Sequence, residues 1–185
     1  MYSGVNPEAI GIFGLIVTVI VAGMEQLGIG LTGADHSKVR LSLSRVAFWF
    51  GGLTQVFTAL VYYLANPLGN PGMSIYLGTI FADFGLFWLL VSGFMKSGGD
   101  SKVMAHFFIV QGFVSLAFAY VAFKLGLIWP LGVVLSLIVL LFITLTFAYY
   151  GNRHMSKVAG VLNIAIGICA TPLFIKALME TVLKH

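Results

Sequence analysis

A single carboxylate interrupts the apolar stretch IFADFGLFW, residues 80–88. It belongs to Asp83, near the middle of an apolar run over residues 73–94 that is long enough to cross a bilayer as a helix. An Asp at the centre of a membrane helix costs roughly 2.5–3.5 kcal/mol, so it faces a bundle interior or a water-filled path. Two interpretations stay open. Asp83 is a polar element of a permeation route and a proton site, or it is a buried, protonated group that hydrogen-bonds a neighbouring helix.

The composition of the whole chain fits the same apolar environment. Of its 185 residues, 59% are hydrophobic and 9% are charged, against about 25% charged residues in an average soluble domain. With about 20 residues per crossing, this length predicts about six transmembrane helices in one domain and leaves no room for a soluble catalytic domain. We therefore predict an all-α, polytopic membrane protein, a single transmembrane helix bundle over residues 1–185. The predicted helices cover residues 9–30, 46–65, 73–94, 103–123, 130–150 and 158–183.

Polar residues inside the predicted helices are candidate functional groups. Gln55 follows a pair of glycines in the second helix, and Gln111 lies well inside the fourth. Each amide needs a hydrogen-bond partner in apolar surroundings. Residues 31–45 are the most charged part of the chain and predict a solvated loop. Pro172 predicts a kink or a break in the last helix.

Motifs for several other functions are absent from the sequence. The net charge is +4, but the basic residues lie in short gaps between apolar runs, where they act as topology signals and do not indicate nucleic-acid binding. The chain has no Cys pair, HExxH, Walker loop or GxGxxG motif. Its histidines fall in predicted loops or near helix ends, so none supports an intramembrane nucleophile. We predict no enzymatic activity, no metal and no cofactor.

The basic residues are unevenly distributed between the two ends of the predicted bundle. Those in the loops after the first, third and fifth helices are Lys38, Arg40, Arg45, Lys96, Lys102, Arg153 and Lys157. The opposite side has Lys124 and the tail residue Lys184. The positive-inside rule therefore places both termini outside.

Four segments spread over the chain together resemble the acetate uptake transporter family, also known as the succinate/acetate permease family. The segment NPEAIGI, residues 6–12, is similar to the family's entrance motif, usually Asn-Pro-Ala-Pro-Leu-Gly-Leu. FGGLTQ at 50–55 resembles its aromatic-Gly-Gly-x-x-Gln segment, and FGLFW at 84–88 its aromatic-Gly-x-Phe-Trp segment. AG at 159–160 with GICA at 167–170 resembles its final helix.

This resemblance implies a six-helix protomer with its own central pathway, assembled as a homo-hexamer. Family members move acetate and related small monocarboxylates or succinate, commonly with protons, and have been described both as proton symporters and as anion channels. The family's narrow point corresponds to Leu15, Phe84 and Leu137. Its entrance Asn corresponds to Asn6, and its second-helix Gln to Gln55.

The chain also departs from the family pattern. Ala9 stands where the entrance motif has its second Pro, and Leu15 stands where an aromatic residue is usual. Gln111 takes a position that often carries Trp, and Asp83 a position where a small polar residue is common. Family members generally have their termini in the cytoplasm, opposite to the orientation given by the basic residues, and we favour the family orientation.

Three functions remain open from the sequence. The first is a pathway for acetate and other small carboxylates, with Asn6, Gln55, Asp83 and Gln111 along it and protons and the lipid bilayer as the further partners. Since an ionised Asp83 would repel an anion, we expect it to be protonated when substrate passes or to carry the coupled proton. The second is a channel for a small neutral or cationic solute such as urea or ammonium. The third is a structural membrane protein without transport activity.

Overall fold

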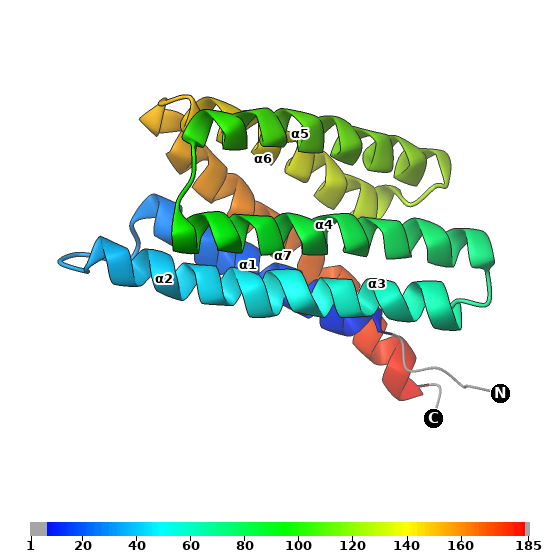
Figure 1. The fold of residues 1–185 in the computed structure, drawn as a ribbon. Coiled ribbons are helices and arrows are strands. Elements are labelled where there is room, and N and C mark those ends of the chain that lie inside the picture. The colour runs from blue at the N-terminus through cyan, green and yellow to red at the C-terminus, as the bar shows by residue number, and fades with distance from the viewer. Residues whose placement is uncertain (1–6, 184–185) are drawn as a thin grey trace.

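All secondary structure in residues 7–183, the part of the chain that the structure describes, is helical (Figure 1). The structure is a computed structural model. The elements in chain order are α1 (Glu8–Leu27), α2 (His36–Val46), η1 (Ala47–Leu53), α3 (Thr54–Ala65), α4 (Pro71–Ser97), α5 (Ser101–Lys124), η2 (Ile128–Gly132), α6 (Val133–Tyr149) and α7 (Arg153–Leu183). Within the described residues, six helical stretches are long and apolar enough to cross a membrane. The predicted all-α membrane fold is confirmed, and the chain is a multi-pass integral membrane protein.

The second membrane-spanning helix begins at His36, well before the predicted start at residue 46. It consists of α2, the π-helical segment η1 and α3, and it runs without a break over His36–Ala65. The predicted solvated loop at 31–45 is therefore wrong for residues 36–45. The helix starts there because Asp35 accepts hydrogen bonds from the Ser37 amide at 2.9 Å and from the Ser37 hydroxyl at 2.6 Å. These two hydrogen bonds hold the pKa of Asp35 below its ordinary value, and the bond from the Ser37 hydroxyl contributes most.

Helix α2 carries exposed charges although it packs on α4. Leu43 and Ser44 are buried, and Lys38 is exposed on the opposite side of the helix. Arg40 is exposed too, but it lies on the side of Leu43 and donates to the Phe94 carbonyl oxygen of α4. The hydroxyl of Ser92 on α4 donates a hydrogen bond to the Ser44 carbonyl oxygen at 2.8 Å. A helix that packs one face on its neighbour can carry charges on the other, so charge density alone does not indicate a loop.

Glycines bring the first and last helices into close contact. A Cβ atom added to Gly23 on α1 would lie 2.7 Å from the Gly160 carbonyl oxygen on α7, and one added to Gly160 would lie 3.0 Å from the Gly23 carbonyl oxygen. Small residues at such crossings allow backbones to approach in membrane bundles. Beside them, Asn163 donates a hydrogen bond from Nδ2 to Gln26 Oε1 at 2.9 Å. The resemblance segment at 159–160 thus serves helix packing.

The last helix, α7, continues through Pro172 as one element. Of the two outcomes predicted for Pro172, a kink or a break, the break is therefore wrong. Proline removes one backbone donor, but membrane helices tolerate this because neighbouring groups satisfy the freed carbonyl. The helix also begins at Arg153, before the predicted start at residue 158.

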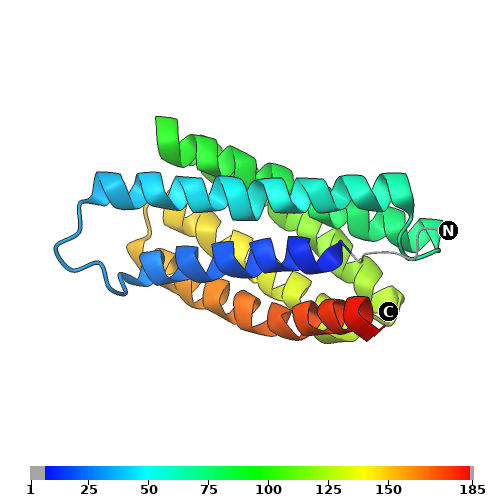
Figure 2. The same ribbon diagram turned by 90° about the horizontal axis from the view of Figure 1, so that it is seen from below.

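The start of α1 and the end of α7 lie at the same end of the bundle, together with the α3–α4 turn (Figures 1 and 2). The loops between α1 and α2, α4 and α5, and α6 and α7 lie at the opposite end. The unevenly distributed basic residues belong to these three loops and the adjoining helix ends. The two ends of the bundle therefore differ in charge, which matters for the orientation of any pathway between them.

Candidate functional site

A narrow cavity lies between the helices at the end of the bundle where α1 begins. Its volume is about 40 Å³, and its walls come from α1, α3, α4, η2, α6 and α7. A water molecule needs about 10–15 Å³ of such space, so the cavity could hold a few waters or one carboxyl group. Its walls are apolar apart from Glu8 and Gln55. Any chemical selection in this cavity therefore falls to these two side chains.

Gln55 is the most distinctive group of the cavity wall. Its side chain is fully buried, and neither Nε2 nor Oε1 has a hydrogen-bond partner among the described residues. It is the second residue of α3, directly after η1, whose Gly51 packs so closely on α4 that a Cβ atom there would lie 2.6 Å from Trp88 Cγ. A buried amide left unpaired costs about 1–3 kcal/mol. It can therefore offer an unused donor and an unused acceptor to a ligand in the cavity.

The predicted constriction residues only partly line the cavity. Leu15 on α1 and Phe84 on α4 do, but Leu137 on α6 does not. The α6 side of the wall is formed by Leu131, Val134, Leu135 and Ile138. These positions follow the spacing i, i+3, i+4, i+7 of one helix face, and residue 137 falls outside that face. The cavity wall therefore includes Ile138 and not Leu137.

Asp83 and Gln111 contact each other away from the cavity. Gln111 donates a hydrogen bond from Nε2 to Asp83 Oδ2, which links α5 to α4. Gln111 is buried and Asp83 is half-buried. Neither lines the cavity, whereas Phe84, the next residue along the chain, does. One residue of a helix corresponds to a rotation of about 100°, which turns Asp83 toward α5. The geometry thus matches the second sequence interpretation, a hydrogen bond to a neighbouring helix.

Glu8 is a cavity residue that sequence analysis did not select. It is the first residue of α1 and lines the cavity. The hydroxyl of Tyr62 on α3, which is itself buried, donates a hydrogen bond to Glu8 Oε2 at 3.4 Å. The signal in the sequence was the position of Glu8 in NPEAIGI, where the family motif has a small Ala. Asn6 of the same motif lies outside the described residues.

A second, open pocket lies at the opposite end of the bundle. It measures about 440 Å³ and includes Glu25, Arg40 and Tyr149 in its walls. The Arg40 guanidinium donates from Nη2 to the Phe94 carbonyl oxygen at 3.2 Å and lies 5.8 Å from the centre of the Phe94 ring. This pocket is polar, wide and exposed, in contrast to the cavity.

Buried aromatic rings separate the cavity from the Arg40 pocket. Along α4 the cavity residues end at Phe84 and the pocket residues begin at Phe94, about 15 Å further along the helix. Between them the Phe87 ring lies 5.1 Å from both the Trp88 and the Phe142 rings, measured between centroids. A path between the two spaces would have to cross this apolar layer.

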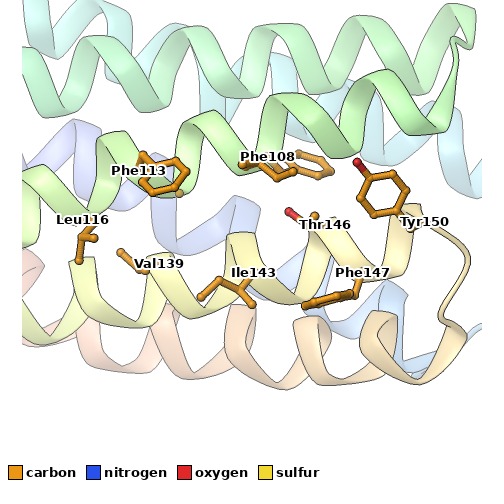
Figure 3. A pocket seen from close by; sticks show the side chains of 10 residues that line it. Phe108, Phe113, Leu116, Val139, Ile143, Thr146, Phe147 and Tyr150 are labelled. Carbon is orange, nitrogen blue, oxygen red and sulfur yellow. The ribbon is translucent and has the colours of Figure 1, made fainter.

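A third space is a surface groove between α5 and α6 (Figure 3). It measures about 430 Å³, and Phe108, Phe113, Ile143 and Phe147 are among its residues. Its buried Thr146 hydroxyl donates to the Phe142 carbonyl oxygen of its own helix at 2.8 Å. The groove suits a hydrocarbon surface and offers little to a carboxylate. In residues 7–183, no group of His, Cys, Asp and Glu side chains is arranged to hold a metal ion.

Comparison with known proteins shows a similarity to a solved structure. No family model and no curated protein matches this sequence. Among solved structures, the bacterial acetate channel SatP is similar over 95% of this chain and 93% of its own, with a TM-score of 0.76 and 21% sequence identity. This chain therefore has the same fold as a bacterial acetate channel, the fold implied by its resemblance to the acetate uptake transporter family.

Proposed function

We propose that this protein is a membrane channel or transporter for acetate and related small carboxylates, including succinate, and that transport is linked to protons. The observation that carries the proposal is the fully buried Gln55 amide, which has no hydrogen-bond partner in the described residues and lies in the wall of a small cavity between the helices. The fold shared with an acetate channel supports the same reading. The constriction residues would be Leu15, Phe84 and Ile138.

The chemistry of the cavity suits a short carboxylate. Gln55 Nε2 can donate to a carboxylate oxygen without a fixed positive charge that would hold the anion too tightly to leave. The apolar wall, with Ile12, Leu77 and Leu173 among its residues, can contact a methyl group. Asn6 would act earlier on the same route, at the entrance.

A second candidate function has one observation in its favour. Glu8 places a carboxylate in the cavity wall, and a carboxylate attracts ammonium or another small cation. Competition separates the two functions. For a carboxylate pathway, other short carboxylates reduce uptake of labelled acetate, and urea and ammonium do not.

The test is uptake of labelled acetate by proteoliposomes that contain the purified protein, with protein-free vesicles as the control for acetic acid that crosses lipid unaided. We expect uptake above that control and inhibition by short carboxylates. Uptake equal to the protein-free control would contradict the proposal. Assembly as a homo-hexamer is part of the proposal, and native mass spectrometry of the detergent-solubilised protein tests it.

A further inference from the structure

We propose that Glu8 donates the proton that accompanies the carboxylate through this protein. This inference rests on the function proposed above and adds the residue and the step by which proton and substrate are coupled. Sequence analysis had considered Asp83 for this role. In the structure, Asp83 accepts a hydrogen bond from Gln111, whereas Glu8 lines the same cavity as Gln55.

The first step of the argument is the small size of the cavity. An ionised Glu8 and a carboxylate substrate would share about 40 Å³ with mostly apolar walls. Two like charges about 4 Å apart repel by about 4 kcal/mol at an effective dielectric constant near 20. One shared proton removes this repulsion, as in carboxylate pairs that cannot both ionise. Substrate can therefore occupy the cavity when Glu8 enters the step protonated.

The second step is the proton transfer itself. The O–H bond of the Glu8 carboxyl group breaks, and an O–H bond forms on the substrate carboxylate. Both partners are carboxyl groups, so the proton passes between groups of the same kind and the transfer needs no other reactant. The Glu8 carboxylate that remains accepts the hydrogen bond of the Tyr62 hydroxyl. Water at the cavity mouth then returns a proton to Glu8.

The third step is passage through the apolar layer beyond the cavity. Phe84, Phe87 and Phe142 are all buried there. An unpaired ion in such surroundings costs several kcal/mol, whereas a neutral acid does not bear this cost. Protonation by Glu8 before this layer thus converts the substrate into the form that crosses more easily.

Titratable groups of two neighbouring helices lie around this end of the cavity. From α3, Tyr62 donates a hydrogen bond to Glu8. On α7, Lys176 and Glu180 form an exposed ion pair with a distance of 3.8 Å, and Glu180 interacts electrostatically with Tyr62. The cavity residues contributed by α4, η2, α6 and α7 are all apolar. Glu8 is thus the acidic group that substrate meets in the cavity wall.

The test compares the wild-type protein with Glu8→Gln in proteoliposomes. Initial acetate uptake is measured at constant external pH, so that the external substrate keeps the same protonation. Two driving forces are applied separately: an interior that is more alkaline by about one pH unit, and an inside-positive potential set with potassium and valinomycin. Protein-free vesicles give the background, and Glu180→Gln removes a carboxylate of α7 that lies outside the cavity wall.

We expect wild-type uptake to rise by up to about tenfold with the alkaline interior, the factor that one pH unit supplies to a coupled proton. It should respond little to the potential, because the neutral acid carries no charge. In Glu8→Gln the stimulation by the alkaline interior should disappear, and the inside-positive potential should now drive uptake. Glu180→Gln should behave as the wild type does.

If the alkaline interior stimulates acetate uptake by Glu8→Gln as much as by the wild type, the inference is overturned and the proposed function stands. Wild-type uptake equal to the protein-free background overturns the proposed function instead. If Glu8→Gln is monodisperse but has lost all uptake, Glu8→Asp decides. Recovery of uptake driven by the alkaline interior supports the proton role, and no recovery overturns it.

Discussion

Gln55 and Gln111 are both buried amides in the membrane-spanning part of the protein, but their surroundings differ. Gln111 donates to Asp83 and joins α5 to α4. Gln55 has no hydrogen-bond partner among residues 7–183 and lines a cavity. A paired amide stabilises a contact between helices, whereas an unpaired amide beside an open space retains its capacity to bind. The polar group most informative about function is therefore the one whose hydrogen bonds the fold leaves unmade.

The largest expected effect is on Gln55. Gln55→Leu removes the free donor while keeping a similar side-chain volume. We expect acetate uptake to fall by about 10- to 100-fold, the equivalent of roughly 1–3 kcal/mol. Thermal stability should stay level or rise, because an unpaired buried amide is replaced by an apolar group. Uptake and the melting temperature, measured on the same preparation, check both. Unchanged uptake in Gln55→Leu would contradict the claim that Gln55, unlike Gln111, binds the substrate.

Gln111→Leu should give the opposite pattern. It deprives the Asp83 carboxylate of its donor, so we expect the melting temperature to fall, at a cost of about 1–3 kcal/mol. Uptake per folded protein should stay close to the wild-type value, since neither residue lines the cavity. Uptake normalised to monodisperse protein is the measurement. A specific loss of uptake in this variant would place the pair in the pathway after all.

A smaller effect should distinguish two neighbouring residues of α6. Ile138→Ala enlarges the cavity and should improve uptake of a longer monocarboxylate relative to acetate by about tenfold. Leu137→Ala is the matched control, because Leu137 packs on the core without lining the cavity. Competition between acetate and butyrate measures the ratio. Equal ratios in the two variants would contradict the assignment of Ile138.

Asp83→Asn should have the smallest effect. The new amide can still accept a hydrogen bond from Gln111, so we expect the melting temperature to be nearly unchanged. Acetate uptake and its dependence on pH should also match the wild type. If the pH dependence changed here and persisted in Glu8→Gln, the proton role would belong to Asp83.

Much of the fold could be predicted from the sequence, because hydropathy over about 20 residues is a strong and local signal. The main error was at α2, where Lys38 is exposed on the side opposite the buried Leu43 and Arg40 is exposed on the side that packs on α4. The number of charged residues in a segment does not show which way each side chain points, so it cannot distinguish a loop from a helix with exposed charges. The continuity of α7 through Pro172 likewise depends on packing between helices.

The candidate site was harder to predict, because it depends on how each helix is rotated about its axis. Asp83 and Phe84 are adjacent in sequence, yet one contacts Gln111 and the other lines the cavity. Gln55 was selected both as a polar residue in an apolar helix and through the family resemblance, and the structure adds that its amide is unpaired. A charged residue at the start of a helix is ordinary, so Glu8 stands out in the sequence only by comparison with the family motif.

The close crossing of Gly23 and Gly160 has a consequence for biosynthesis. Among the described helices, α1 is made before the others and crosses α7, which is made after them, at these two glycines. Helix α7 also supplies Ala170 and Leu173 to the cavity wall. During translation α1 must wait in the membrane without its main partner until α7 is inserted. A chain cut short before α7 lacks Ala170 and Leu173 of the cavity wall, so the cavity is complete only after α7 has been made.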